Sequence, residues 1–439
     1  MTLESIDSFT ARSGTADFDS LAAELGLYSS PELIASPTST AEIAAALAYA
    51  QAHGLDVAVR SGGHGGFAAT DNTLLLDLRA FADVEVLDSE RVRVGTGAVW
   101  GEVATALAPH GLAISSGDTY TVGVGGLTLG GGVGWMVRQY GLALDSLLEA
   151  EVVLVSGEVV TASHDSEAEL FWALRGGGGN FGVVTSFTFQ AHPLPSVVAG
   201  SITLDPGALD RTALATTLKA WRDVMRSAPA ALNVTYLGMP AFGPDAPATS
   251  TLLVVFGGDN LDEATAAIEP LLALPGVVSS DIAPKSYVDV LERMEKPEGE
   301  ITMVDNNSFA DDFSDSLIDD LAAAHESFGA AVLMIRYLRG ALNDIPVDAT
   351  AFAHRGAEVL LISAAFLGPD APAGADATIR ERWSTLGDRT SGLYGNFSPT
   401  TGEAITARMY PPATLDLLRA AKRTYDPTNL LRQNHNVLP

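Results

Sequence analysis

The chain has 439 residues, with 25 Lys and Arg against 54 Asp and Glu, a formal net charge of −29, and no cysteine. This charge repels nucleic acid and anionic membrane surfaces, so neither is expected as a partner. Without cysteine the chain can form no disulfide, thiolate metal cluster or thioether-linked cofactor. The composition, 47% hydrophobic and 18% charged, is typical of a globular protein of two or three domains.

The apolar stretches are far shorter than the roughly 20 residues that a membrane span needs. The first twenty residues contain Glu4, Asp7, Asp17 and Asp19 and lack the basic-then-apolar order of a secretory signal. We therefore expect a cytoplasmic protein, either a monomer or a small homo-oligomer.

The first elements predict a small α+β lobe. Ser39 and Glu42 form an S-x-x-E capping box for a helix that ends at His53, where Gly54 provides a left-handed stop. Further elements are expected as strands at 56–60 and 73–78, a hairpin at 84–97, and a helix at 99–110 closed by Gly111.

Glycines then gather between residues 117 and 134, where they leave little side-chain volume for a core. This segment is expected to be a loop shaped around a ligand. The next elements are expected as a strand and hairpin at 144–160, a helix at 166–174 capped by Ser166, a second glycine loop at 175–182 and a strand at 183–189.

A second domain is expected after Pro193 and Pro195. Residues 201–391 alternate strands with longer helices, which are expected at 211–226, 261–274 and 315–327. The chain ends with a helix at 413–425 and an extended segment at 429–439.

The sequence does not contain either of two familiar phosphate-binding motifs in its working form. No lysine follows a glycine, as a P-loop requires, and the G-x-G-x-x-G of Gly177, Gly179 and Gly182 follows a helix and opens a strand, the reverse of the dinucleotide order. Residues 60–64 read R-S-G-G-H after a strand, and small residues there can turn their N–H groups toward an anion. Taken alone, His64 could equally be a loop residue without a role.

Several motifs together resemble one family. They are R-S-G-G-H at 60–64, T-V-G-V-G-G-L-T-L-G-G-G-V-G-W at 121–135, Y-G-L at 140–142, E-L-F-W-A-L-R-G-G-G-G-N-F-G-V-V-T at 169–185, and Y-D-P-T-N at 425–429 with Asn434 and Asn436. On these motifs the chain resembles the berberine-bridge-enzyme-like FAD oxidases of the vanillyl-alcohol-oxidase/p-cresol-methylhydroxylase (PCMH) superfamily. The resemblance is weakest between residues 200 and 340.

The resemblance implies an α+β fold with a two-lobed PCMH-type FAD-binding domain and a substrate domain whose antiparallel β-sheet is flanked by helices. We expect the FAD domain at 1–198, the substrate domain at 199–395, and a C-terminal segment at 396–439 that returns to the FAD domain.

The resemblance also implies that His64 is bonded to the 8α-methyl of the flavin. Many relatives add a link from a cysteine at the position of Thr119, which cannot form one, so we expect a monocovalent FAD. Further FAD-binding residues are expected at Arg60, Ser61, Gly62, Gly63, Gly65, Val122, Gly123, Gly125, Gly126, Leu127, Gly130, Gly131, Gly132, Gly134, Tyr140, Gly182, Val183, Val184, Asn434 and Asn436.

Val122 matches the position beside the reactive edge of the flavin, where in the family valine accompanies reactivity with oxygen. The expected activity is hydride transfer from a small or medium organic substrate (an alcohol, sugar, amine or natural-product C–H) to flavin N5, with O2 reduced to H2O2. Two alternatives remain open: a dehydrogenase that uses another acceptor, and a flavin-binding protein whose catalytic site has decayed.

The proton of the substrate needs an acceptor. Tyr394, in the motif Y-G-N-F at 394–397 together with Asn396, resembles a tyrosine that lines the active site in the family, and Tyr410 is the second choice. A phenol has a pKa near 10, so the pKa of the catalytic tyrosine must be depressed for it to act as a base.

Two departures from the family pattern predict a site stripped of polar groups and fitted to a bulkier or more apolar substrate. Gly66 stands where many relatives have a tyrosine, and the strand after the F-A-H-R motif at 352–355 is mostly apolar. No metal site is expected, because His325-Glu326 is not followed by a second histidine at the zinc spacing.

Overall fold

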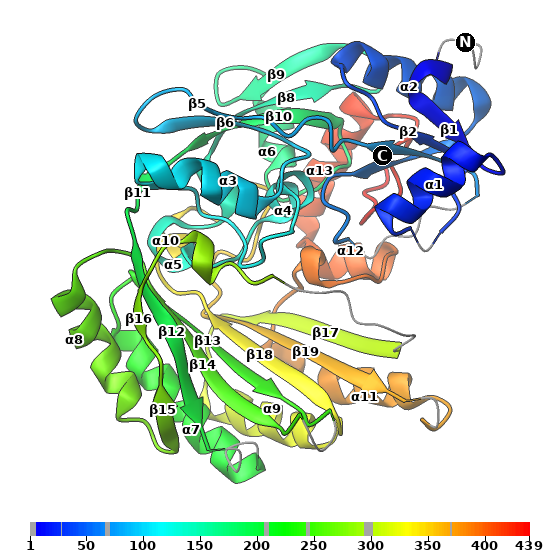
Figure 1. Ribbon diagram of the computed structural model, residues 1–439. Coiled ribbons are helices and arrows are strands. Elements are labelled where there is room, and N and C mark those ends of the chain that lie inside the picture. The colour runs from blue at the N-terminus through cyan, green and yellow to red at the C-terminus, as the bar shows by residue number, and fades with distance from the viewer. Residues whose placement is uncertain are drawn as a thin grey trace.

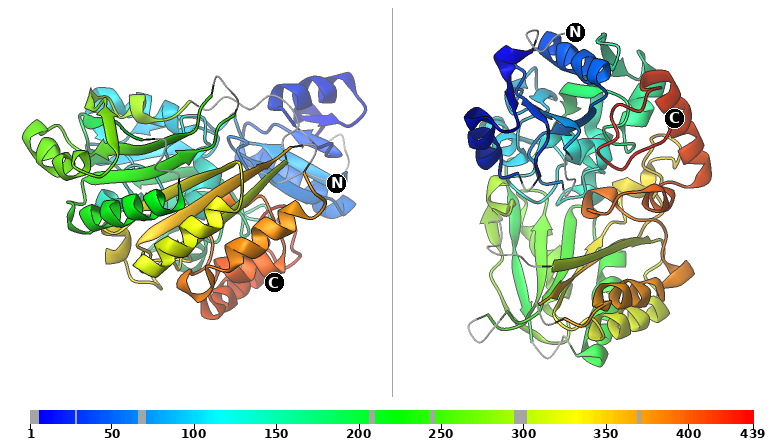
Figure 2. Two further views of the ribbon diagram at one scale, coloured as in Figure 1. Left: turned by 90° about the horizontal axis from the view of Figure 1, so that it is seen from below. Right: turned by 90° about the vertical axis from the view of Figure 1, so that its right-hand side faces the viewer.

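Two parts of the molecule meet along one face of a large antiparallel sheet in the computed structural model, which describes residues 6–27, 29–65, 71–205, 210–242, 246–293, 302–368 and 371–439. The upper part in Figure 1 contains both ends of the chain, and the lower part contains its middle. The right-hand view of Figure 2 shows the same division. Helices and largely antiparallel sheets in both parts confirm the α+β prediction.

The N-terminal sheet has the order β1-β2-β4-β3, with parallel pairing of β4 to both β2 and β3. The strands are β1 Thr10–Arg12, β2 Leu33–Ala35, β3 Asp56–Arg60 and β4 Thr73–Asp77, and the helices beside them are α1 Ala16–Leu25 and α2 Thr40–His53. The capping prediction for α2 is confirmed: the Ser39 side chain accepts a hydrogen bond from Glu42 N, and Gly54 has a φ of 69°.

The second sheet of the upper part is antiparallel, in the order β5-β6-β10-β8-β9. Its strands are β5 Val84–Val86, β6 Arg91–Gly95, β8 Leu147–Val153, β9 Val159–Ser163 and β10 Val183–Gln190. Helices α3 Trp100–Leu107 and α6 Ala168–Leu174 bury apolar side chains in the same core. Two short strands, β7 Leu112–Ala113 and β11 His192–Pro193, pair separately.

Two local predictions for this part are wrong. The glycine segment at 117–134 is not all loop, because Val124–Gly130 form the helix α4; a further short helix, α5 Val137–Tyr140, follows it. Ser166 does not cap α6: the cap is Glu167, at a φ of 49°, and the Ser166 carbonyl instead accepts a hydrogen bond from Ser163 N.

The large sheet has eight strands, in the order β15-β12-β14-β13-β18-β19-β17 with β16 paired to β12. They are β12 Val197–Leu204, β13 Leu232–Met239, β14 Thr249–Phe256, β15 Val277–Ser280, β16 Ala283–Lys285, β17 Thr302–Ala310, β18 Ala331–Tyr337 and β19 Val359–Leu367. Four helices cover its lower face in Figure 1 and share its core: α7 Arg211–Ser227, α8 Leu261–Leu272, α9 Asp315–Glu326 and α11 Ala375–Ser384. The predicted helices at 211–226, 261–274 and 315–327 are confirmed.

The end of the chain returns to the upper part through α12 Glu403–Met409 and α13 Pro412–Tyr425. The side chain of Lys422 is fully buried, and its Nζ donates to Asp426 Oδ2 at 2.7 Å, to Asn180 O at 2.9 Å and to Leu431 O at 3.0 Å. The Asn180 side chain in turn bonds to the backbone of His435 and Val437. These contacts hold the C-terminal segment against the second glycine loop.

Arg138 of α5 fixes the upper part on the lower one. Its buried guanidinium donates to the carbonyl oxygens of Ala228, Pro229, Leu232 and Arg339, and it lies 5.2 Å from the centre of the Tyr337 ring. Burial lowers the pKa of Arg138 to about 10, which leaves it charged at neutral pH. One side chain thus satisfies carbonyl groups from two segments of the lower part.

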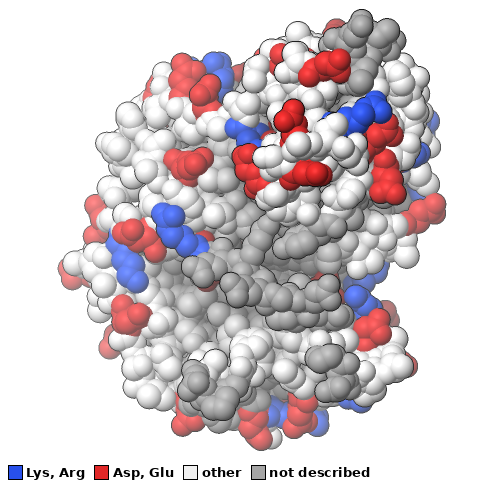
Figure 3. Space-filling view, turned by 45° about the vertical axis from the view of Figure 1, so that its right-hand side comes forward, with Lys and Arg blue, Asp and Glu red and all other residues white. Residues whose placement is uncertain are grey.

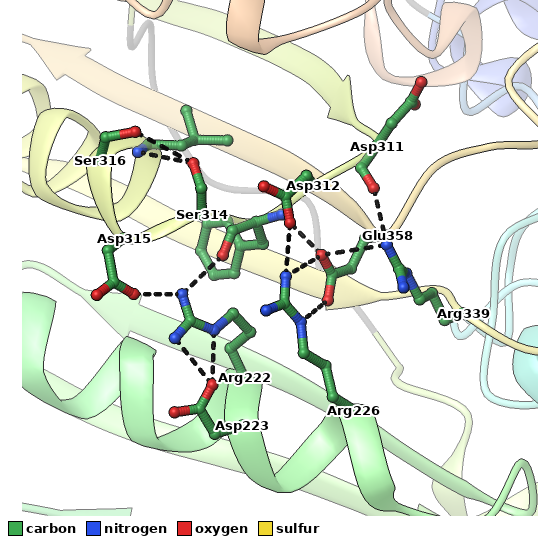
Figure 4. Close-up of polar contacts among 12 residues, drawn as sticks. Arg222, Asp223, Arg226, Asp311, Asp312, Ser314, Asp315, Ser316, Arg339 and Glu358 are labelled. Atoms are coloured by element: carbon green, nitrogen blue, oxygen red, sulfur yellow. Dashed lines mark hydrogen bonds and ion pairs between the residues drawn. The ribbon is translucent and has the colours of Figure 1, made fainter.

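Glu358, directly before β19, forms a second buried anchor, within the lower part (Figure 4). Its carboxylate accepts two hydrogen bonds from Arg226 of α7, at 2.7 and 2.8 Å, one from Phe313 N at 2.7 Å and one from the Tyr337 hydroxyl at 3.2 Å. Burial opposes ionisation of Glu358, but the hydrogen bonds from Arg226 and Phe313 N and the charges of Arg339 and Arg226 outweigh it and hold its pKa below the usual value of 4.5.

We predict that Glu358→Ala lowers the free energy of unfolding by about 3 kcal/mol, because it leaves the partners of a buried charge unpaired. Glu381→Ala, an exposed glutamate on α11, is the control and should change the stability little. The pKa of Glu358 is lower in the folded than in the unfolded state. Its contribution to the free energy of unfolding is therefore present at neutral pH and is lost as the pH falls through the folded-state pKa. Urea denaturation at pH 7 and pH 4 checks both points, and equal losses at the two pH values would contradict the assignment.

Candidate active site

Two glycine-rich segments cross at the centre of the upper part. The first, residues 60–65, leaves β3, and the second precedes α4. The Ser61 hydroxyl donates to Thr96 O at 2.6 Å and accepts from Gly125 N at 3.3 Å. This one side chain therefore joins both segments to the end of β6.

At the crossing, backbone lies directly on backbone. A Cβ on Gly62 would lie 2.4 Å from Gly123 N, and a Cβ on Gly123 would lie 2.1 Å from Gly62 N. No side chain larger than hydrogen fits at either position without moving one of the segments. The glycines are required here for close approach, and neither of them has a positive φ.

His64 lies just beyond the crossing, on the surface. Its Nε2 is 2.9 Å from the Thr121 hydroxyl, so the imidazole sits at the same junction of the two segments. A ring nitrogen that is both exposed and oriented can bond to a ligand held by these loops. Gly66, where many relatives were expected to have a tyrosine, lies outside the described residues.

The other end of α4 carries the predicted Tyr-Asn pair. Gly132 N donates to the Tyr394 hydroxyl at 2.7 Å. The Asn396 amide donates to the same hydroxyl at 3.0 Å and to Leu127 O at 3.1 Å. The seven residues of α4 span about 10 Å, so the helix separates the His64 junction from Tyr394 by roughly that distance.

Tyr394 does not have the depressed pKa that a catalytic base would need. Its ring is buried among apolar side chains, and this burial raises the pKa of its phenol. The hydrogen bonds from Gly132 and Asn396 and the charge of Arg336 oppose the rise but do not overcome it. With this chain's own groups, Tyr394 is therefore a neutral phenol at pH 7.

Tyr410 lies elsewhere, in the core of the upper part. Its hydroxyl donates to Gly176 O at 2.9 Å, and burial raises its pKa as well. The structure does not bring Tyr410 together with Tyr394, and its bond to the second glycine loop is a packing contact.

Thr119 sits beside a charged cluster that sequence reasoning missed. Thr119 forms a β-bridge with Glu292, and its hydroxyl donates to Asp118 at 3.2 Å. Asp118 forms an ion pair with the buried Arg336 of β18. The Arg336 guanidinium lies 5.7 Å from the Phe397 ring centre, and Phe397 packs edge-on against Tyr394 at 5.1 Å. The site thus has a cation and two carboxylates near Tyr394.

The strand β19 is apolar on the face toward Tyr394, as predicted, but the site is not stripped of polar groups, because polar residues come from β17 and β18. Asn307 of β17 accepts from Tyr394 N at 2.6 Å and donates to Phe397 O at 3.1 Å. Asp305 lies on the same face of β17, two residues along the strand. The run Asp305-Asn306-Asn307 within β17 was the available signal.

The remaining predicted cofactor residues fall into three groups. Arg60, Gly63, Gly65, Val122, Gly126, Leu127, Gly130, Gly131 and Gly134 lie in or next to the crossing segments and α4. Gly182, Val183 and Val184 open β10, one residue from Thr185, whose carbonyl accepts from Thr96 N. Tyr140 instead stacks on His192 at 3.9 Å, in the cluster between the two parts, and Asn434 and Asn436 follow α13.

In the part of the chain that the structure describes, His, Asp and Glu residues form no group that could hold a metal ion. Among the same residues, no helix has the length and hydropathy needed to cross a membrane.

The chain is similar to a family of known proteins. Residues 31–163 match the family described as FAD binding domain. The chain is 32% identical over 436 residues to (R)-6-hydroxynicotine oxidase of Paenarthrobacter nicotinovorans, covering 93% of this chain and 91% of that protein.

Solved structures agree along the whole length. A 6-hydroxy-D-nicotine oxidase from Arthrobacter nicotinovorans superposes with a TM-score of 0.84 at 29% identity, covering 98% of this chain and 97% of that one. A glucooligosaccharide oxidase from Acremonium strictum, whose FAD is described as 6-S-cysteinyl, 8α-N1-histidyl, superposes with a TM-score of 0.85 at 26% identity, covering 99% of each chain.

Proposed function

Because the chain belongs to the berberine-bridge-enzyme-like FAD-linked oxidases, we propose that it oxidises a small or medium organic substrate, with FAD bonded to His64 alone and O2 reduced to H2O2. It is an FAD-linked oxidoreductase. The observation that carries the proposal is the junction at which Gly62 crosses Gly123 and His64 meets Thr121.

The residues of this junction fit an FAD. A Cβ on Gly126, at the start of α4, would meet no atom within 4 Å, so the backbone there is open to a ligand. The side-chain oxygens Oδ1 of Asn434 and Asn436 are buried and have no hydrogen-bond donor among the described residues, as expected where donor groups of a cofactor are missing. Arg60, Ser61 and the glycines of the two segments would hold the cofactor, and His64 would tether it.

A single tether follows from the residue at position 119. Thr119 offers no sulfur, and its side chain is buried against Asp118. His64 is exposed at the junction and is therefore the nucleophile that we propose for the covalent bond. Bound FAD would supply the two-electron chemistry, accepting hydride from the substrate and passing the electrons to O2.

Tyr394 and Asn396 act on the substrate. The Tyr394 hydroxyl accepts hydrogen bonds from Gly132 N and the Asn396 amide, so its own proton remains to be donated to an oxygen or nitrogen of the substrate. The same two donors stabilise the phenolate if the proton leaves. We propose that Tyr394 orients the substrate as a hydrogen-bond donor and that Asn396 positions Tyr394.

We further propose that the protein works in the cytoplasm, as a monomer or small homo-oligomer. The net charge of −29 supports solubility, and acidic side chains are spread over the face in Figure 3.

The covalent link is tested by acid precipitation of the purified holoenzyme. We predict that the yellow flavin stays in the pellet of the native protein and moves to the supernatant in His64→Ala. Thr121→Val is the matched control, because it removes the hydroxyl beside His64 but keeps the imidazole. Flavin in the supernatant of the native protein, or in the pellet of His64→Ala, would refute the attachment.

Tyr394→Phe and Tyr410→Phe separate catalysis from packing. Each variant removes one buried hydroxyl, so we predict a similar loss of about 1 kcal/mol in the free energy of unfolding. Only Tyr394→Phe should lower kcat/KM, by about 100-fold. Stability is measured by urea denaturation and turnover by peroxide release. Equal activities of the two variants would mean that Tyr394 has no role in the reaction, as in a decayed enzyme.

Reoxidation distinguishes an oxidase from a dehydrogenase. We predict that flavin reduced anaerobically by dithionite regains its absorbance within seconds of mixing with air-saturated buffer, and that one H2O2 forms per flavin. Slow reoxidation by air, with rapid reoxidation by an artificial acceptor, would assign a dehydrogenase instead.

A further inference from the structure

The candidate site lies between α4 of the upper part and the face of the large sheet that lies toward the upper part. This face of the sheet is here called the wall of the site. Along β19, Val359, Leu361 and Ala365 belong to the core under the helices. Leu360 and Ile362 alternate with them and pack with Tyr394. Because side chains alternate between the faces of a strand, the even-numbered residues of β19 face the site.

This wall carries an apolar patch, here called the platform. The platform comprises Leu237, Val332, Met334, Ile362, Ala364 and Phe366, all of them half-buried. The register places Leu237 beside Met334, Met334 beside Ile362, and Val332 beside Ala364, so the patch is continuous. Since Ile362 also packs in the Tyr394 cluster, the platform is continuous with the candidate site.

One carboxylate borders the platform. Asp305 pairs in register with Ala364 and lies about 7 Å along β17 from Asn307, which holds the backbone of Tyr394. Arg380 donates to the backbone carbonyl of Asp305, at 3.2 Å, but no Lys, Arg or His among the described residues forms an ion pair with the carboxylate. Asp305 is half-buried, and burial raises its pKa.

The other charges nearby do not balance this carboxylate. Arg336 is paired with Asp118, and Glu292, next to Thr119, adds another carboxylate. The charge of Arg380 also acts on Asp305, so two guanidiniums stand against three carboxylates around the site. Such a site attracts a cation and repels an anion.

The platform is a poor surface for an oligosaccharide. Its six side chains offer no hydrogen-bond donor or acceptor, so sugar hydroxyls pressed against them would lose their bonds to water without replacement. An aromatic or alicyclic body would gain from the same contact.

We propose that the substrate is an apolar amine whose hydrocarbon body lies on the platform and whose protonated nitrogen binds near Asp305. This inference rests on the proposed oxidase function. The bound ammonium releases one proton to solvent, after which oxidation breaks one C–H and one N–H bond and forms C=N. The two electrons and two protons reach O2 and give H2O2.

Binding tests the inference without turnover. Phenyltrimethylammonium is a permanent aromatic cation whose nitrogen has neither a proton nor a lone pair, so it cannot form an imine. In calorimetry with the holoenzyme, we expect it to bind more tightly than benzyl alcohol, and benzyl alcohol more tightly than benzoate. Asp305→Asn should weaken binding of the cation about tenfold and leave that of benzyl alcohol unchanged.

Two further variants sharpen the test. Asp262→Asn, on α8 at the opposite face of the sheet, should leave the binding of phenyltrimethylammonium unchanged. Ile362→Asn should weaken the binding of both the cation and benzyl alcohol, with the melting temperature measured to confirm folding. Benzoate binding as tightly as the cation, or equal effects of Asp305→Asn and Asp262→Asn, would overturn the inference.

Turnover separates this inference from the proposed function. Peroxide release is measured with N-methylbenzylamine, benzyl alcohol and cellobiose. Peroxide from the amine, with an increased KM in Asp305→Asn, is expected. Peroxide from cellobiose alone would refute the amine while leaving the oxidase intact. If no compound reduces the flavin, the oxidase proposal loses its support, and the calorimetry still decides what the platform binds.

Discussion

The contact between Gly62 and Gly123 is the constraint on which the rest of the site depends. Two backbone segments meet there at a separation that excludes any Cβ, and the Ser61 hydroxyl ties both of them to Thr96. This contact sets the position of α4, whose first turn meets the His64 segment and whose last turn meets Tyr394 and Asn396. A larger side chain at the crossing would therefore disturb both the proposed tether at His64 and Tyr394, the proposed substrate-binding residue.

The junction between the two parts of the molecule completes the candidate active site. Arg138 bonds to carbonyl groups of the lower part, and Asp118 pairs with Arg336, so the large sheet presents a fixed face to α4. Buried charges in such positions fix the orientation of the two parts, because moving one partner leaves the other charge buried without its counter-charge or hydrogen-bond acceptors. The same junction brings strands β17 and β18 to Tyr394, and with them the charges and the platform that we propose select the substrate.

Much of the fold could be predicted from local sequence. The capping of α2 by Ser39, the strand at 56–60 and the helices on the lower face of the sheet depend on contacts within a few residues, and they appear as predicted. The segment at 117–134 was predicted to be a loop but contains the helix α4, because glycine has two structural uses. It frees a loop, but it also lets a helix pack closely, as Gly125 does against Thr96. Distinguishing these uses requires the partner strand, which lies far away in the sequence.

The sequence by itself determined the family, the FAD domain and the position of His64 in a glycine segment, because these features are contiguous motifs. It also placed Tyr394 next to Asn396. Only the tertiary structure decided that burial raises the pKa of Tyr394, that Tyr410 belongs to the core, and that Asp305 and Arg336 share a wall with Ile362. Burial and charge pairing arise between residues distant along the chain, and the face that a strand residue occupies depends on a register that no single segment encodes.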